Sequence, residues 1–326
     1  MVYCAPIGET NQPVKGKSAW SALAFPGCGR SLLCAALGAA LALSVQTPAQ
    51  VSAPAPLGPG DPAWLAYRAV RPIAVFGSER GVPDTIVILG KDVLEQSAGR
   101  ELAAGWQGML NRVPRVLEDG NPGPPGSGET LVVMGTQTEM KKWHPELAAG
   151  AALGPDGYRL HRVGHILLIE GGDARGALYG AFALLREIAE EHSLAVLDEH
   201  SEPSAAVRWT NEWDNPDGTI ERGYAGPSIF FENGHVRADL KRAASYARLL
   251  ASVGIDGCTI NNVNADARLL LPENLKEIAR IADVFRPYGV RLSLSIDMSS
   301  PQKIGGLASF DPLDPQVAAW WQRKVD

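Results

Sequence analysis

The sequence predicts an α/β protein in which a small N-terminal α/β domain precedes an incomplete (β/α)8 TIM barrel of about three strand–helix units. Short apolar strands alternate with amphipathic helices over residues 61–205. A regular strand–loop–helix pattern then occurs three times over residues 206–326. Polar residues gather where the strands of that pattern end, which is where α/β folds place their sites.

Composition excludes several classes of protein. A net charge of −6 and an isoelectric point near 5.6 disfavour binding to a nucleic-acid backbone, which requires a basic surface. No apolar run reaches the roughly 20 residues of a membrane helix. The 35 glycines and 24 prolines stay below the roughly 25–30% that is typical of disordered chains. We therefore expect a folded protein with neither nucleic acid nor membrane as a partner.

Residues 1–49 have the pattern of a signal peptide. A segment with basic residues precedes the apolar run 31–45, and Thr47 and Ala49 are small residues that suit cleavage after Ala49. The basic residues are Lys15, Lys17 and Arg30. Residues 50–60 belong to a Pro-rich linker. The pattern predicts export to the periplasm or the medium; the alternative is a short buried helix.

After cleavage one cysteine would remain, Cys258 in an apolar strand. We therefore expect Cys258 to be buried and no internal disulfide to form.

The elements expected in the first domain alternate between strand and helix. The strands are Thr85–Leu89, Leu131–Met134 and a hairpin of Tyr158–Arg162 with Ile166–Ile169; the helices are 92–110 and 174–192. Asp173 is the expected N-cap of the last helix.

We interpret this domain as non-catalytic. The glycines of GGDARGALYG (171–180) do not fit the G-x-G-x-x-G pattern of dinucleotide sites, so they are better explained as packing glycines. His161 and His165 lie in a hairpin, where a spacing of four does not place them together as zinc ligands. No metal and no cofactor are expected.

The second domain, 206–326, is expected to begin a parallel sheet. Its strands are Ala206–Trp209, Gly257–Val263 and Val290–Ile296, and its helices are Asp239–Val253, 272–288 and a third from Pro315. A doubly wound sheet and a barrel both fit. No phosphate-cradling glycine loop follows the first strand, which favours the barrel. A whole barrel needs about 250 residues, so the predicted barrel is incomplete.

Candidate site residues follow these strands. Trp213 lies in Asn-Glu-Trp-Asp-Asn, and an aromatic ring beside amides and a carboxylate suits a sugar; a core tryptophan is an equally good explanation. Asn261, Asn262 and Asn264 either bind hydroxyl groups or form a turn.

Asp214 and Asp297 are carboxylates without a visible catalytic counterpart. Glu221 and Arg222 are expected to form a local ion pair.

Four segments carry a specific resemblance. RWTNEWDNPDGTIERGYAGPSIFFENG (208–234), YARLLASVGIDGCTINNVNADARLL (246–270), ADVFRPYGVRLSLSID (282–297) and GGLASFDPLDPQVAAWWQRK (305–324) resemble the catalytic domain of glycoside hydrolase family 67, the α-glucuronidases of xylan breakdown. Residues 61–205, with ARGALYGAFALL, resemble that family's N-terminal domain, a type shared with hexosaminidases.

The resemblance implies an inverting hydrolysis that removes 4-O-methylglucuronic acid, α-1,2-linked to xylose, from glucuronoxylan-derived oligosaccharides. It implies that Trp213 stacks on the uronic acid, that Val263 lines the pocket, and that Asn211 and Asn262 make polar contacts. In the family the catalytic carboxylates come from later strands, which correspond to positions after Asp326. The resemblance therefore implies that this polypeptide by itself is inactive and prone to aggregate, and that a homodimer is a possible state of the full-length enzyme.

Two other functions stay open. One is a non-catalytic carbohydrate-binding product of a truncated gene. The other is a different, hexosaminidase-like glycosidase, which preference for N-acetyl sugars over uronates would reveal.

Overall fold

The computed structural model describes residues 63–118, 130–148, 150–261 and 265–325. The signal peptide and the Pro-rich linker predicted above lie outside these ranges. None of the helices in the described ranges is long and apolar enough to cross a membrane. The boundary placed between residues 205 and 206 stays a prediction.

The first sheet has six strands in the order β2-β1-β3-β5-β4-β6. Strands β2, β1, β3 and β5 are parallel, and β4 is antiparallel to both β5 and β6. The strands are β1 (Thr85–Ile88), β2 (Arg115–Leu117), β3 (Leu131–Thr136), β4 (Tyr158–Val163), β5 (Ile166–Gly171) and β6 (Asp198–Ser201). The helices are α1 (Pro72–Phe76), α2 (Val93–Leu110), α3 (Gln137–Trp143) and α4 (Ala174–Ala189). The expected hairpin is confirmed as β4 and β5.

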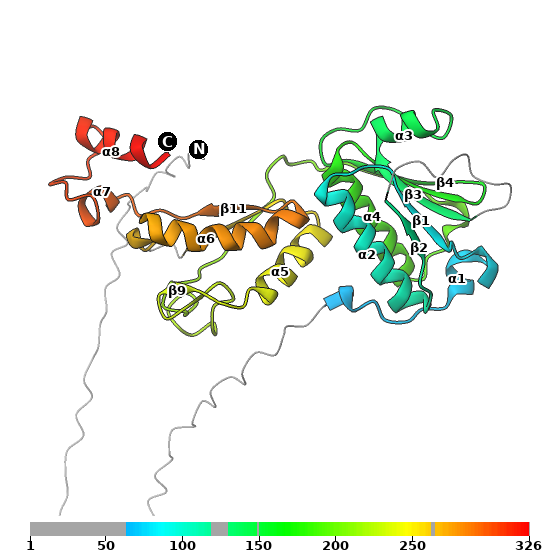
Figure 1. The fold of residues 1–326 in the computed structure, drawn as a ribbon, viewed down its shortest axis with the longest axis horizontal. Coiled ribbons are helices and arrows are strands. Elements are labelled where there is room, and N and C mark those ends of the chain that lie inside the picture. Colours follow the sequence, from blue (N-terminus) through cyan, green and yellow to red (C-terminus); the bar gives the residue numbers. More distant parts are fainter. Residues whose placement is uncertain (1–62, 119–129, 149, 262–264, 326) are drawn as a thin grey trace, which may run out of the picture. The chain divides into compact units, whose positions relative to one another are not determined.

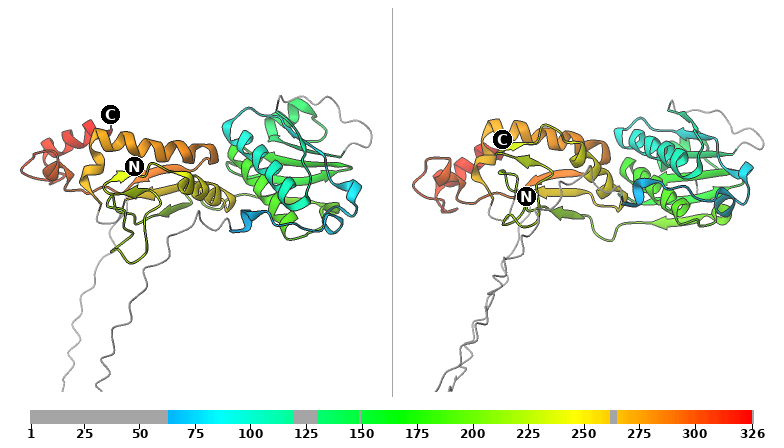
Figure 2. Two further views of the ribbon diagram at one scale, coloured as in Figure 1. Left: turned by 60° about the horizontal axis from the view of Figure 1, so that its bottom comes forward. Right: turned by 90° about the horizontal axis from the view of Figure 1, so that it is seen from below.

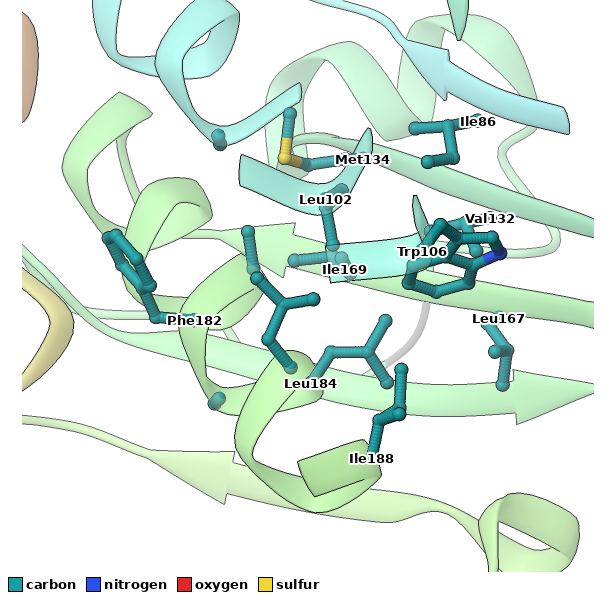
Figure 3. Packing of buried hydrophobic residues seen from close by; sticks show 14 of the residues in the cluster. Ile86, Leu102, Trp106, Val132, Met134, Leu167, Ile169, Phe182, Leu184 and Ile188 are labelled. Carbon is teal, nitrogen blue, oxygen red and sulfur yellow. The ribbon is translucent and has the colours of Figure 1, made fainter. Parts of the chain in front are cut away.

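Helices cover both faces of this sheet. Helices α2 and α4 lie side by side on one face (Figure 1), and the core between them and the sheet includes Trp106, Leu102 and Phe182 (Figure 3). Alternate residues of the strands point to the other face, where Val87 and Val133 pack with Met140 of α3. The predicted N-cap is confirmed, because the Asp173 side chain accepts a hydrogen bond from the Gly176 backbone at 2.7 Å.

The glycines of α4 are packing residues, as expected. A Cβ at Gly176 would lie 2.2 Å from the carbonyl oxygen of Gly157, and one at Gly180 would lie 2.7 Å from a methyl group of Ile169. The helix can therefore approach the chain beneath it only where these side chains are absent. The structure also agrees with the interpretation of the two hairpin histidines. His165 is exposed, and His161 is buried with its Nε2 3.2 Å from the Leu147 carbonyl oxygen.

The second sheet has three parallel strands in the order β7-β10-β11, which is their order along the chain. They are β7 (Trp209–Asn211), β10 (Gly257–Ile260) and β11 (Arg291–Leu294). Helices α5 (Lys241–Ser252) and α6 (Pro272–Phe285) connect them, and the short strands β8 (Phe231–Glu232) and β9 (His235–Val236) form a hairpin before α5. Helix α6, drawn in orange in Figure 2, runs along β11. Helices α7 (Ser300–Lys303) and α8 (Pro315–Val325) follow. These are successive βα units, as a barrel requires.

Two strand boundaries differ from the sequence prediction. The first strand was expected at Ala206–Trp209 but begins at Trp209, because Trp209 pairs with Gly257, the first residue of β10. A Cβ at Gly257 would lie 2.1 Å from the Trp209 ring, so the pairing depends on this glycine. The second strand ends at Ile260, since Asn261 has a left-handed backbone with φ 78°. Cys258 is buried, as expected.

Asp256 fixes the start of all three strands. Its carboxylate accepts a hydrogen bond from the Arg208 backbone N–H at 2.8 Å. It also forms an ion pair with the Arg291 guanidinium, which donates a hydrogen bond at 2.6 Å. Its backbone N–H donates to the Arg208 carbonyl, and its carbonyl accepts from the Arg291 N–H. The side chain is fully buried, so its charge depends on these partners.

We expect Asp256→Ala to lower the free energy of unfolding by about 3 kcal/mol, because it removes the buried acceptor of the Arg208 N–H and of the Arg291 guanidinium. Denaturant unfolding followed by circular dichroism measures this. The control is Asp283→Ala, which removes an exposed pair with Arg286 and should cost less than about 1 kcal/mol. Equal losses in the two variants would contradict the role given to Asp256.

A pH effect on stability is expected at Glu95. Its carboxyl group is buried beside Glu139, and burial and this second carboxyl group raise its pKa well above 4.5. Above about pH 4.5 the folded protein therefore holds a proton that the unfolded chain has released. The stabilisation that the protonated Glu95 provides is lost as the pH rises through the raised pKa.

Glu95→Gln removes the titration. Relative to this variant, the wild-type protein should lose at least about 1.4 kcal/mol of unfolding free energy between pH 4.5 and high pH, which is the value of one pKa unit. Thermal unfolding across this range is the measurement. Parallel stability profiles of the two proteins would show that Glu95 titrates normally.

Candidate functional site

The carboxyl ends of β7, β10 and β11 meet at one edge of the second sheet, because the three strands are parallel. A pocket of about 700 Å³ lies in the loops at this edge. All three strands contribute a following segment to its lining. The lining residues are Asn215, Pro216, Asp217, Thr219, Glu221, Arg222, Gly223, Ala265, Asp266, Ala267, Arg268, Lys303 and Ile304. The edge predicted to carry the site therefore holds a polar cavity.

Asn215 organises the loop that follows β7. Its backbone N–H donates to the Thr219 carbonyl at 2.8 Å, and its side-chain amide donates to the Thr219 hydroxyl and the Glu221 carbonyl at 2.9 and 2.8 Å. The Glu221 N–H in turn donates to the Trp213 carbonyl at 2.8 Å. These bonds join the pocket wall to the backbone of Trp213.

Trp213 is not a core residue. The residue is 38% exposed, which argues against the core tryptophan that the sequence left open as an alternative. Its backbone carbonyl is bonded to the pocket wall through the Glu221 N–H, but Trp213 is not among the residues that line the pocket. Asn211 is exposed at the end of β7. Asn262 and Val263 lie outside the described residues, so their predicted contacts stay predictions.

Asn261 is a structural residue. It is buried, its amide donates to the Ser295 carbonyl at 2.9 Å, and its side-chain oxygen accepts from the Asp266 N–H at 3.2 Å. The side chain thus connects the segments after β10 and β11. For this asparagine the turn-forming alternative is correct.

The charged side chains around the pocket are mostly paired with one another. Arg268 donates to Asp266 at 3.0 Å, and Lys303 donates to Asp297 at 2.6 Å. The ammonium group of Lys303 and the hydroxyl of Ser299 lower the pKa of Asp297 to about 2. Arg268 likewise lowers the pKa of Asp266. Asp297 is therefore a fixed anion at neutral pH and is a poor proton donor.

The prediction of an ion pair between Glu221 and Arg222 is wrong. Glu221 instead accepts a hydrogen bond from the Tyr224 hydroxyl. Within the described residues, Arg222 has no hydrogen-bond or ion-pair partner and is exposed. A left-handed backbone at Glu221, with φ 56°, turns neighbouring side chains in different directions, which their spacing in the sequence does not reveal.

Asp214 is buried rather than open to the pocket. Burial raises its pKa to about 6, although hydrogen bonds from Ser228 and the Ile229 backbone act against this. Glu212 accepts a hydrogen bond from the Tyr246 hydroxyl. Neither Asp214 nor Asp297 lines the pocket, so the described residues do not place these two carboxylates across a common cavity.

Metal-ligating groups come together elsewhere. Glu187, Glu190 and His192, at the end of α4, are the one cluster in the described ranges whose ligand atoms lie within 4.8 Å of one another. His192 is already 3.0 Å from Glu187. This cluster belongs to the first sheet and does not line the pocket.

Comparisons with known proteins cover almost all of the described chain. The model of the glycosyl hydrolase family 67 N-terminus matches residues 63–184, and the model of the family 67 middle domain matches residues 187–326. The α-glucuronidase of Hypocrea jecorina is 43% identical over 275 residues, which cover 82% of this chain and 32% of that protein. The α-glucuronidase A of Aspergillus tubingensis is 42% identical over 269 residues, covering 81% and 30%.

Similarity to solved structures is weaker. A family GH115 4-O-methyl-α-glucuronidase, BtGH115A, described as specific for decorated arabinogalactans, matches 74% of this chain and 34% of its own with a TM-score of 0.49 and 17% identity. The chain spans about a third of the length of the curated relatives that it matches. Two adjoining family models and this degree of identity establish that the chain belongs to glycosyl hydrolase family 67.

Proposed function

We propose that this chain is part of an α-glucuronidase that removes α-1,2-linked 4-O-methylglucuronic acid from xylo-oligosaccharides. The observation that carries the proposal is 41–43% identity to α-glucuronidases across four fifths of the chain. The polar pocket at the strand ends and the exposed Trp213 beside its wall support it, since a sugar acid needs both an apolar ring contact and polar partners. Glucuronoxylan-derived oligosaccharides are the partners that the proposal implies.

The proposed reaction is a single displacement with inversion. One carboxylic acid protonates the leaving xylose oxygen, while a carboxylate on the opposite face activates a water molecule; the two groups lie about 6.5–9.5 Å apart in inverting enzymes. Later barrel strands supply these carboxylates in the whole protein. The contribution of the present residues is binding: Trp213 stacks on the uronic acid, Val263 lines the same pocket, and Asn211 and Asn262 contact hydroxyl groups. The predicted export fits oligosaccharides that derive from xylan, a polymer outside the cell.

The first test is to read the gene beyond codon 326 and assay the encoded protein. We expect further strand–helix units that carry a glutamate and two more carboxylates, and release of 4-O-methylglucuronic acid from aldouronic acids. Proton NMR during turnover should show the β-anomer first, because inversion of an α-linkage gives it. An α-anomer as first product would refute the mechanism, and turnover of N-acetylhexosaminides instead would favour the hexosaminidase-like alternative.

The role of Trp213 is tested by binding in the full-length protein that the gene encodes. Trp213→Ala should weaken the binding of glucuronic acid, a ligand that is not turned over, by about tenfold in titration calorimetry because the ring contact is lost. Trp143→Ala, in α3 of the first sheet, is the matched control and should leave affinity unchanged. Equal affinities of the Trp213 variant and the wild type would show that this ring does not contact the sugar.

A further inference from the structure

Asp214 is a buried acid that the reaction proposed above does not use. It is 2% exposed and stands between Trp213, the proposed sugar contact, and Asn215, which organises the pocket loop. An isolated antiparallel bridge joins Asp214 to Ile220, and the next residue, Glu221, donates its N–H to the Trp213 carbonyl at 2.8 Å. The backbone of Trp213 is therefore held at the residue that carries the buried carboxyl group.

The two carboxyl oxygens of Asp214 have different surroundings. The Ser228 hydroxyl and the Ile229 backbone N–H donate hydrogen bonds to the carboxyl group. The Ser228 oxygen itself accepts from the N–H groups of Phe230 and Phe231, both at 3.0 Å, so its proton is available for Asp214. Within the described residues, Oδ1 of Asp214 is buried and has no hydrogen-bond partner. The two hydrogen bonds therefore go to Oδ2.

This arrangement suits a protonated acid better than a carboxylate. In the acid, Oδ1 carries the proton, Oδ2 keeps both hydrogen bonds, and no charge is buried. In the carboxylate, Oδ1 holds part of a negative charge that no donor among the described residues solvates. Burial accordingly raises the pKa of Asp214 to about 6, and the nearby charge of Glu212 acts in the same direction.

The other ionisable groups around Asp214 come from β10 and α5. The Cys258 thiol of β10 interacts electrostatically with Asp214, and burial raises the pKa of this thiol to about 12. On α5 the Tyr246 hydroxyl donates to Glu212, and burial raises the pKa of the hydroxyl well above its usual value. Both groups are neutral between about pH 5 and pH 8. Glu212 is the other acid in this cluster, and a variant separates its effect.

We propose that Asp214 is a positioning residue that couples a proton to the sugar contact: the protonated side chain holds the loop that presents Trp213, and loss of the proton loosens it. A carboxylate at this position gains free energy by turning toward water, and the backbone beside Trp213 must move for that to happen. The inference rests on the proposed function in one respect, namely that Trp213 contacts the uronic acid.

The direction of the pH effect follows from linkage. The buried arrangement binds the proton more strongly than an arrangement in which Asp214 meets water. The stabilisation that the proton gives to the loop is therefore present at low pH, and it is lost as the pH rises through about 6. Sugar binding should follow the same course.

The test is titration calorimetry of the full-length protein that the gene encodes with glucuronic acid, from about pH 5 to pH 8. The ligand's own carboxyl group is ionised throughout this range. Asp214→Asn supplies a neutral amide whose oxygen can accept the two hydrogen bonds. Glu212→Gln is the matched control in the same segment. Melting temperatures establish that each variant is folded.

We expect the affinity of the wild type to fall about tenfold across this range relative to Asp214→Asn, which is the equivalent of one pKa unit. Other groups of the whole site titrate equally in both proteins, so the ratio of the two affinities isolates Asp214. Glu212→Gln should keep the pH dependence with a lower midpoint, because one charge that raises the pKa of Asp214 is removed. A ratio that does not change with pH overturns the inference.

A second readout needs no sugar. The fluorescence of Trp213 is the difference between each protein and its own Trp213→Phe variant, measured at each pH. This difference should change near pH 6 with Asp214 present and stay constant with Asp214→Asn. Such a change without binding of glucuronic acid at any pH supports the positioning role and refutes the proposed function. A difference that is constant in both proteins overturns the positioning role, whatever the affinity.

Discussion

The second sheet depends on the buried carboxylate of Asp256. It binds backbone and side-chain donors from the residues that begin or precede its neighbouring strands, and it aligns β7, β10 and β11 at their amino ends. Parallel strands that start in register and have similar lengths also finish together. The loops after Asn211, Ile260 and Leu294 therefore share one edge, and the pocket between them is a consequence of this alignment.

The pocket is held by bonds within and between its loops. Asn215 shapes the first loop, and Asn261 joins the segments that follow the second and third strands. Asp297 accepts from Lys303 and Ser299 and so stabilises the third. Polar residues at strand ends are expected for a site, yet several of these support the loops instead of facing a ligand. Trp213, Arg222 and Tyr224, in contrast, are exposed.

A second buried carboxylate ties the first sheet to the helices of the second. Glu101 of α2 accepts from the Arg248 guanidinium of α5 at 2.6 and 2.8 Å and from the hydroxyls of Tyr67 and Tyr288 at 2.7 and 2.9 Å. All hydrogen-bonding capacity of this carboxylate is used, which offsets the cost of burying it. The first sheet and its helices thereby contribute to the stability of α5, and helices α2 and α4 close the hydrophobic core of the first sheet (Figure 3).

The sequence by itself determined the two-sheet α/β organisation, the family, the β4–β5 hairpin, the cap at Asp173 and the gathering of polar residues at the strand ends, because these depend on local periodicity and short motifs. Boundaries set by pairing across the sheet, such as the start of β7, required the partner strand. Only the tertiary structure decided that Trp213 is exposed, that Asp214 is buried, and that Glu221 binds Tyr224 and leaves Arg222 unpaired. Burial and partner choice depend on backbone direction and on distant segments, which neighbouring residues in a sequence do not encode.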